Sequence, residues 1–489
     1  MRDHMRMNLR CFEEQPLVDL RKAQQAIHRK APQVKSSKAE VHAKIHRIPT
    51  LCFTSERRLT SYSGLILFQA LLQKLRLKER LRRCFAHLSV QPIFGHPTIL
   101  SLLIVHLLLG FRRLRGLDYY RHDPLVARVV GLRHLPDVAT VSRALASLDE
   151  RSIEAVRSVS RELVTARLAE ESFPRITVDF DGTVQSTTGH AEGTAVGYNK
   201  IKKGARSYYP LFATVAQTGQ FFDLHHRAGN VHDSSGALSF LTRCLDHVRA
   251  AMPGAKLESR MDAAFFNEEM LGGVDRQGVD FTISTPFERF PALKQIVLKR
   301  RLWEVVDSEW SSFEIAWRPK SWTGQWRFVA LRHRKNKPHK GPLQLDLFEP
   351  RDQEYEYKVI VTNKKESARA VLLFHNGRGA QEKIFGEAKQ HVALDLVPTR
   401  TLHGNQLFTL AGMLAHNLTR ELQMQATSRE RRAAPKRPPQ WDFAELGTIR
   451  QQLLHVAGEL THPQGELTLK VNDNPVVRTE LLRLLEPLC

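Results

Sequence analysis

Three acidic residues stand where a carboxylate could take part in chemistry. Asp181 lies near the end of a predicted strand, Asp262 ends another strand just before a predicted helix, and Glu382 lies on a predicted helix. Two strand-end aspartates and a helix glutamate are what a two-metal phosphoryl-transfer site requires, because carboxylates hold two Mg²⁺ ions about 3.5–4 Å apart. Asp179, on the same strand face as Asp181, is the alternative first acid. Because the chain holds 51 acidic residues, spacing alone leaves open that each is a solvated or capping acid.

The predicted helix around Glu382 carries a polar stripe. At 100° per residue, one face of the segment HNGRGAQEKIFGEAK holds His375, Arg378, Glu382 and Lys389. Glu387 points about 140° away from Glu382 and is the poorer candidate for a third acid. Cationic side chains beside a metal site can grip DNA phosphates. We therefore expect Arg378 and Lys389 to position DNA without binding metal.

The charge of the chain indicates a polyanionic partner. The 489 residues suffice for about two to four domains, and 42% apolar with 25% charged residues excludes a disordered or fibrous protein. Lys and Arg number 73 against 51 Asp and Glu, which leaves +22, with a pI of about 10.0. Such a surplus is typical of proteins that bind nucleic acid or an anionic membrane surface.

The membrane alternative is weak. The most apolar run, Thr98–Gly110, is too short to span a bilayer and contains His106, so it predicts a buried core helix. The basic start MRDHMRMNLR has no apolar stretch behind it, so we expect no secretory signal. The five cysteines are scattered without a Cys-x-x-Cys pair, which argues against disulfides and structural zinc. A reduced cytoplasm and a nucleic-acid partner are expected.

Periodicity predicts an α/β fold with a mixed sheet. Residues 175–183 alternate strictly between apolar and polar positions, as a strand does, and further strands at 209–216, 219–225 and 255–262 alternate with helices. The expected organisation is a basic arm (1–55), a helical DNA-binding region (56–172), a core (173–298), a β-rich insertion (299–360), the end of the core (361–425), and a basic linker with a C-terminal module (426–489). Within the helical region, residues 135–149 are either the second half of a helix-turn-helix or a plain core helix.

Basic and aromatic clusters supply candidate DNA contacts. Beside the first strand, the candidates are Tyr198, Lys200, Lys202, Lys203 and Arg206. In the insertion, a basic loop contributes Arg332, Arg334 and Lys335, for which a solvated charge run is an equal alternative. Trp317, Trp322 and Trp326 are candidates for stacking on an unpaired base, although core packing of a small β domain is the commoner role of such residues.

Several of these motifs together resemble the insertion-sequence DDE transposases of bacteria. The helix follows that family's signature of tyrosine, two residues, arginine, three residues, glutamate, six residues and lysine, with His375 in place of the tyrosine. Asp181-Gly182-Thr183 resembles the first-acid motif. The segments 193–210 (GTAVGYNKIKKGARSYYP), 227–230 (RAGN) and 260–266 (RMDAAFF) resemble the branch called DDE domain group 1. The similarity runs from about residue 59 to about residue 422.

This resemblance implies an RNase H-like mixed-sheet catalytic core interrupted by a β-rich insertion, with an all-α N-terminal DNA-binding region. It also implies that Asp181, Asp262 and Glu382 bind two Mg²⁺ ions, for which Mn²⁺ can substitute. Imidazole at His375 can replace the hydrogen bond of the family's tyrosine. The arm before residue 59 is longer than the family needs.

The expected function is cut-and-paste transposition. The protein would bind the terminal inverted repeats of an insertion sequence, cleave them and join the ends to target DNA, as a homodimer in a synaptic complex. It would work in the bacterial cytoplasm at the nucleoid, without a membrane partner. The alternatives are a metal-dependent nuclease on the same fold and a catalytically silent DNA-binding protein derived from a transposase.

Overall fold

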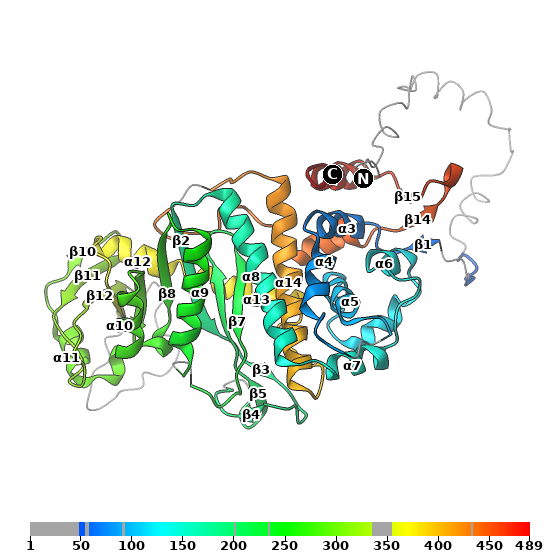
Figure 1. Cartoon of the computed structure of the whole chain (residues 1–489). Coiled ribbons are helices and arrows are strands. Elements are labelled where there is room, and N and C mark those ends of the chain that lie inside the picture. Colours follow the sequence, from blue (N-terminus) through cyan, green and yellow to red (C-terminus); the bar gives the residue numbers. More distant parts are fainter. Residues whose placement is uncertain are drawn as a thin grey trace, which may run out of the picture. The chain divides into compact units, whose positions relative to one another are not determined.

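The computed structural model of the protein describes residues 48–53, 58–89, 93–199, 202–232, 235–334, 355–431 and 434–489. The chain forms two compact units, one made of residues 1–57 with Cys489 and the other of Arg58–Leu488. Most of the predicted basic arm, together with Lys200 and Lys335, lies outside the described residues. All elements discussed below belong to the second unit (Figure 1).

The first part of this unit is almost entirely helical. It begins with the short strand β1 (Leu59–Thr60) and continues with α3 (Leu65–Lys74), α4 (Leu77–Cys84), α5 (His96–Leu108), α6 (Pro124–Val129), α7 (Val138–Ala146) and α8 (Glu150–Glu171). Asp123, Asp137 and Asp149 cap α6, α7 and α8 by accepting hydrogen bonds from the first-turn N–H groups, which have no partner within the helix. Helix α5 is buried nearly all round, which confirms the core helix predicted from its apolar run.

The end of the chain completes this helical part. The elements are α14 (Leu402–Ala426), α15 (Leu446–Ile449) with a π-helical turn (Arg450–Leu454), β14 (Gly458–Thr461), β15 (Thr468–Val471) and α16 (Pro475–Leu485). Strand β14 pairs with β1, and a Cβ added at Gly64 would overlap the carbonyl of Leu453. One apolar core joins α3–α8, α14 and the last 45 or so residues. Figure 1 shows α14 (orange) lying against the N-terminal helices (blue to cyan).

A nine-stranded mixed sheet forms the rest. In chain order its strands are β2 (Arg175–Gly182), β6 (Leu211–Val215), β7 (Gln220–His225), β8 (Lys256–Met261), β9 (Asp280–Thr285), β10 (Glu304–Val305), β11 (Trp310–Ile315), β12 (Arg327–Arg334) and β13 (Tyr355–Thr362). Their spatial order is β10-β11-β12-β13-β9-β8-β2-β6-β7. Strand β8 runs parallel to β2 and β9, and the other neighbours are antiparallel. The strands of the expected insertion thus continue the same sheet, because β13 pairs with β9.

Helices cover both faces of this sheet. Phe180 of β2 packs on Phe240 of α9 (Ala237–Ala251), and α10 (Glu268–Arg276) shares that apolar core. Asp179 and Asp181 alternate with Phe180 along the strand, so they lie on the other face, which α12 (Ala368–Asn376) and α13 (Gly379–His391) cover. The predicted helix that carries His375 and Glu382 is therefore not continuous, because the segment breaks into two helices at Gly377 and Arg378.

A small three-stranded sheet adjoins the end of β2. It consists of β3 (Gln185–Ser186), β4 (Ala195–Val196) and β5 (Arg206–Tyr208), in the order β3-β5-β4. Thr183 N–H donates to the carbonyl of Pro210, so this sheet lies where β2 ends and β6 begins.

Candidate active site

Asp181 and Asp262 occupy equivalent positions on neighbouring parallel strands. Asp179 of β2 is the register partner of Arg260 of β8, and their side chains meet in an ion pair. Asp181 and Asp262 lie two residues further along each strand, where the side chains return to the same face. The register therefore brings both carboxylates to one edge of the sheet, on the face covered by α13.

Helix α13 is fixed over this face by two contacts. Gln381 Nε2 donates to the backbone carbonyl of Asp179 at 3.0 Å. Phe385 packs edge-on against Phe212, which is the register partner of Asp181 on β6, with ring centroids 5.5 Å apart. Glu382, one residue after Gln381, is held near the end of β2 by these contacts.

Arg378 links two of the three carboxylates. Its Nη1 donates to Asp181 Oδ2 at 3.0 Å, and its Nη2 donates to Glu382 Oε1 at 3.1 Å. The side chains of Arg378 and Asp181 are each 19% exposed, whereas that of Glu382 is 65% exposed. Asp262 accepts a hydrogen bond from Ala264 N–H at 3.0 Å and begins the short 3-10 turn after β8. The structure thus joins the first and third predicted acids through one guanidinium.

The carboxylates do not form a preassembled metal cluster. Among the residues that the structure describes, no three His, Cys, Asp or Glu side chains lie together as a metal-binding group. The donor set nevertheless suits a hard divalent cation, because all three side chains offer carboxylate oxygens. The guanidinium between Asp181 and Glu382 shows that a positive charge is accommodated between these two acids.

Asp179 has a structural role that distinguishes it from Asp181. Both of its oxygens accept hydrogen bonds from Arg260, at 2.5 and 2.6 Å, and both side chains are buried. Burial raises the pKa of the Asp179 carboxyl, and the Arg260 guanidinium opposes this change. With both oxygens bound to Arg260, Asp179 is not a substitute for Asp181 as a metal ligand.

The predicted basic linker is packed against the sheet. We call residues 434–441 the strap. The Lys436 carbonyl accepts from Arg260 Nη1 at 2.8 Å, Arg437 forms an ion pair with the buried Glu258, and Trp441 is 1% exposed. A Cβ added at Gly377 would overlap both the Lys436 carbonyl and the Arg260 guanidinium. Glycine is therefore required where the chain passes from α12 to α13 under the strap.

One residue of the predicted polar stripe, His375, has another position than expected. His375 lies on α12, is 2% exposed, and hydrogen-bonds through Nδ1 to Thr282 and through Nε2 to Ser284. Burial holds its pKa well below the usual value. Both ring nitrogens are thus hydrogen-bonded to β9, which contradicts the prediction that His375 contacts DNA. Lys389 remains on α13 and is half-buried.

Glu387 is buried, and its carboxylate forms contacts with other elements of the fold. It pairs with Arg420 of α14 and accepts from Leu446 N–H at 3.1 Å. This acid joins α13 to α14 and to the start of α15. The helical geometry correctly separated it from Glu382.

The candidate contacts beside β2 lie in the loop between β4 and β5. Lys202 and Lys203 are exposed, and Tyr198 is 49% exposed with its ring edge-on to His232. Arg206 is instead tied to Thr194, because its Nε donates to Thr194 Oγ1 at 3.1 Å. Since the small sheet starts at the end of β2, this loop belongs to the same edge of the main sheet as Asp181.

The candidates on β12 and after β11 are mostly packed. Arg332 lies between the rings of Trp303 and Tyr355, at 4.6 and 4.5 Å from their centroids, while Arg334 is exposed. Trp317 packs edge-on against Phe290. Packing thus uses much of the surface of Arg332 and Trp317.

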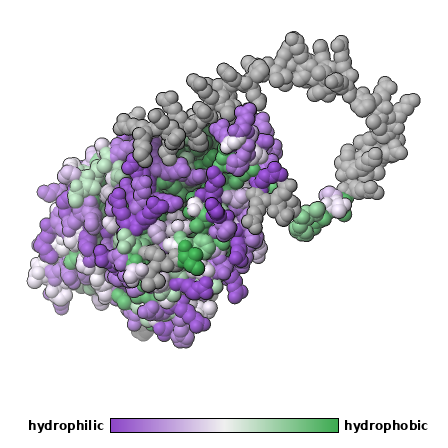
Figure 2. Space-filling view, turned by 45° about the vertical axis from the view of Figure 1, so that its right-hand side comes forward, coloured by the Kyte–Doolittle hydropathy of each residue, from purple (hydrophilic) through white to green (hydrophobic). Residues whose placement is uncertain are grey.

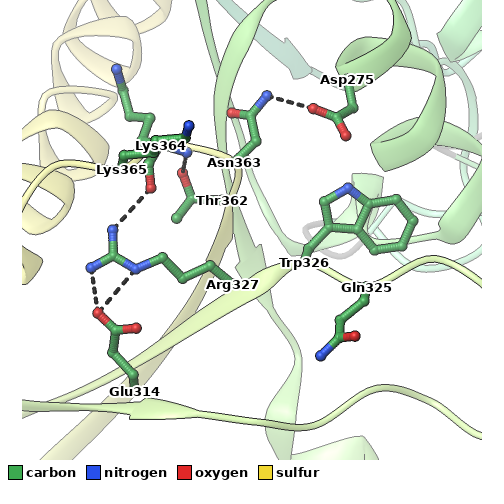
Figure 3. A pocket seen from close by; sticks show the side chains of 9 residues that line it. All are labelled: Asp275, Glu314, Gln325, Trp326, Arg327, Thr362, Asn363, Lys364 and Lys365. Carbon is green, nitrogen blue, oxygen red and sulfur yellow. Dashed lines mark hydrogen bonds and ion pairs between the residues drawn. The ribbon is translucent and has the colours of Figure 1, made fainter.

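The two other tryptophans lie against α10 and its surroundings. Trp322 contacts Phe266 and Trp326, with centroids 4.8 and 5.6 Å apart. Trp326 lines a hollow of about 420 Å³ together with Arg327, Asn363, Lys364 and Lys365 (Figure 3). Asn363 hydrogen-bonds to Phe281 N–H, near the start of β9, so the hollow lies at the opposite edge of the sheet from the carboxylates.

One basic residue near the site was not among the residues predicted from the sequence. Lys358 lies on β13, and its pKa responds to the charges of both Arg378 and Glu382. The alternating pattern of 355–362 could have indicated a strand face, but the sequence held no signal that this face meets α12 and α13.

The face of the molecule seen in Figure 2 is mostly hydrophilic, with smaller apolar areas between the hydrophilic ones. Large exposed apolar side chains are scattered over distant elements, as with Tyr119, Leu302 and Val476. Within the described residues, no helix has the length and apolarity needed to cross a bilayer. The described cysteines, Cys52, Cys84, Cys244 and Cys489, are all free thiols.

Comparison with known proteins places the chain among DNA transposases. The model of the family "Transposase DDE domain group 1" matches residues 51–489, nearly the whole chain, and the protein belongs to this family. No curated protein sequence matches it.

Solved structures with some likeness are also transposases. A cryo-EM structure of the piggyBac transposase synaptic complex with hairpin DNA is 10% identical, with a TM-score of 0.41, over 73% of this chain and 74% of that one. The Mos1 transposase paired-end complex with the left transposon end is 9% identical, with a TM-score of 0.17, over 53% of this chain and 70% of that one. A Mos1 mariner paired-end complex with Mn is 10% identical, with a TM-score of 0.16, over 54% and 71% of the two chains.

Proposed function

We propose that this protein is a metal-dependent transposase that binds the ends of an insertion sequence, cleaves them and joins them to target DNA. The observation that carries the proposal is the placement of Asp181 and Asp262 at matching positions of adjacent parallel strands, with Glu382 held over the same face and linked to Asp181 through Arg378. Membership of the DDE transposase family supports the same chemistry.

We assign the central strands to an RNase H-like core. Strands β7, β6 and β2 form an antiparallel meander, and β8 and β9 then add in parallel on the other side of β2. The parallel strands follow helical crossovers through α9 and α10. This order places the acids at the carboxyl ends of β2 and β8, and α13 brings the third acid from the end of the core.

The three acids share one role in the proposed mechanism, and the basic residues around them have another. Asp181, Asp262 and Glu382 would hold two Mg²⁺ ions, or Mn²⁺ in their place. When bound, these ions activate the attacking oxygen and stabilise the leaving oxygen of a phosphodiester. Arg378 and Lys389 would orient the DNA backbone by donating to phosphate oxygens. The exposed Lys202 and Lys203 would bind the same strand further from the cut.

The remaining assignments concern binding. We assign end recognition to the helical region and a two-copy synaptic assembly to the active protein, because joining two element ends requires both ends to be held together. The net charge of +22 suits long DNA contacts.

The experiment combines purified protein with duplexes that carry candidate terminal repeats, a target plasmid and Mg²⁺. Strand products are mapped at nucleotide resolution. The proposal expects nicks at the repeat boundary and joining of a pre-cut end to the plasmid, both lost in Asp262→Asn. Hydrolysis without joining would identify a nuclease, and binding without any cleavage would identify a silent DNA-binding protein.

A further inference from the structure

Lys358 reaches the catalytic face from a strand of the expected insertion. On β13 it is the register partner of Leu331, and the next residue, Val359, pairs with Thr285 of β9. Val359 and Val361 pack in the core on the α9 side of the sheet. Lys358 alternates with them, so its side chain lies on the α12 side. Its Nζ donates to Asn376 Oδ1, at the end of α12, at 2.9 Å.

The charge of Lys358 is coupled to the candidate active site. Burial lowers the pKa of its ammonium, the Arg378 guanidinium lowers this pKa further, and the Glu382 carboxylate raises it. The pKa of His375, which is hydrogen-bonded to β9, is lowered first by burial and then by the charges of Lys358 and Arg378. These effects place Lys358 in the same electrostatic cluster as the arginine that links the acids.

Lys358 is half-buried, and among the described residues it forms no ion pair, unlike the buried cations around it. Arg260 is paired with Asp179, and Lys364 with Glu258 and Asp280. Within the part of the chain that the structure describes, no carboxylate lies within 4.0 Å of the Lys358 ammonium, and its hydrogen-bond acceptor is a neutral amide. Partial withdrawal of an ammonium from water is unfavourable when no carboxylate is in direct contact with it. An anion that enters the site would remove this cost.

We propose that Lys358 binds a backbone phosphate of the DNA strand that is cut at Asp181, Asp262 and Glu382. The inference rests on the proposed function, since it assigns a further DNA contact to that site. A phosphodiester matches the position, because its oxygens can accept the N–H groups of Lys358 that Asn376 leaves available. Asn376 acts as a positioning residue that keeps the ammonium directed along the sheet face. The β12–β13 hairpin thereby contributes to the active site, in addition to extending the sheet.

The first test is chemical protection, which does not depend on cleavage. The full-length protein is acetylated with acetic anhydride, with and without an end duplex and in the absence of metal, and each lysine is quantified by mass spectrometry. We expect the duplex to slow acetylation of Lys358 by at least about fivefold. Lys299, exposed on α11 (Pro291–Lys299), whose apolar side chains pack on the opposite face, should react equally in both samples. Equal acetylation of Lys358 with and without DNA would overturn the inference.

The second test measures cleavage of an end duplex by Lys358→Met, Lys358→Arg and the charge-matched control Lys299→Met. A lost charge-assisted hydrogen bond predicts a rate about 10–100-fold lower for Lys358→Met, recovery of at least tenfold in Lys358→Arg, and no change in the control. A DNA duplex with a neutral methylphosphonate at the contacted backbone position should be cut by the wild-type protein as slowly as Lys358→Met cuts the normal duplex. On that modified duplex, Lys358→Met should lower the cleavage rate no further. Additive losses at every position, or a wild-type rate in Lys358→Met, would contradict phosphate binding.

The two proposals fail in different ways. Suppose that the duplex slows acetylation of Lys358 in the wild-type protein, but the protein cuts no end duplex with Mg²⁺. The proposed transposition is then wrong, and the phosphate site stands. If wild-type protein cuts and Lys358 is neither protected nor needed, the site is wrong and the transposase function stands.

Discussion

Asp179 and Asp181 lie two residues apart on one strand face, and we predict opposite consequences for their replacement by asparagine. Asp179→Asn leaves the fully buried Arg260 without its counter-charge. Breaking a buried ion pair in this way costs about 3–5 kcal/mol of folding free energy. Asp181→Asn instead weakens a partly exposed contact with Arg378, and such pairs contribute about 0–1 kcal/mol.

The difference is large enough to measure by thermal unfolding. The entropy of unfolding is about 2.1 cal/mol/K per residue, which gives roughly 0.9 kcal/mol/K for a unit of about 430 residues. A loss of 3–5 kcal/mol therefore lowers the melting temperature by about 3–6 °C in Asp179→Asn. The same arithmetic predicts a change of about 1 °C or less in Asp181→Asn.

Cleavage should show the reverse order. If Asp181 is a ligand in a site that supplies several kcal/mol of transition-state stabilisation, its loss lowers the rate by at least about a thousandfold. Asp179→Asn, assayed well below its melting temperature, should keep most of the wild-type rate. DNA binding, measured by anisotropy, should be nearly unchanged in both variants. If folded Asp179→Asn is inactive while Asp181→Asn cuts normally, the first acid has been assigned to the wrong residue.

Four further predictions follow from the packing and the charge. Gly377→Ala should lower both the stability of the protein and its cleavage rate, because the added Cβ overlaps the strap. Gly379→Ala, which has open space around it, should lower neither. Equal behaviour of the two variants would refute the close passage of the strap over Gly377. Glu387→Ala should destabilise the protein by about 3–5 kcal/mol in a denaturant titration, whereas a solvated glutamate would leave the midpoint in place. Burial lowers the pKa of His106 to about 4, so its contribution to stability is fully present above pH 6.5 and is lost as the pH falls towards 4. His106→Gln should reduce the fall of the unfolding free energy between pH 6.5 and 4. An unchanged slope would contradict burial of the neutral ring. End binding should weaken steeply with salt, with a log–log slope near −0.9 per neutralised phosphate, and a flat dependence would show that the basic charge serves another partner.

Local patterns predicted those features that a single segment determines. The alternation of residues 175–183 corresponds to β2, the apolar run at 98–110 to α5, and the predicted strand at 255–262 to β8. These patterns arise from burial on one or both faces of an element, so they are visible in the sequence. They also sufficed to propose Asp181 and Asp262 as strand-end residues.

Features that depend on distant segments were beyond the sequence. The helical period continues through Gly377, and only the crossing of the strap explains why the helix breaks there. The buried partners of Glu387 and His375 lie on α14 and β9, which no spacing rule connects to them. The position of Lys358 beside the candidate site depends on the register between β13 and β9. Each of these contacts joins residues whose proximity is set by the complete fold.

The late arrival of β14–α16 has a consequence for how this chain matures on the ribosome. The helices near residues 65–108 emerge early, but part of their apolar surface is covered only by α14 and by residues 446–488. Synthesis proceeds at about 5–20 residues per second. Part of the apolar surface of those helices therefore stays exposed for roughly 20–80 seconds, until the last residues have been made. A polypeptide released before its last 40 or so residues would keep its proposed catalytic acids yet lack part of the core beneath its N-terminal helices. Premature termination should therefore yield aggregation-prone fragments that chaperones or proteases remove.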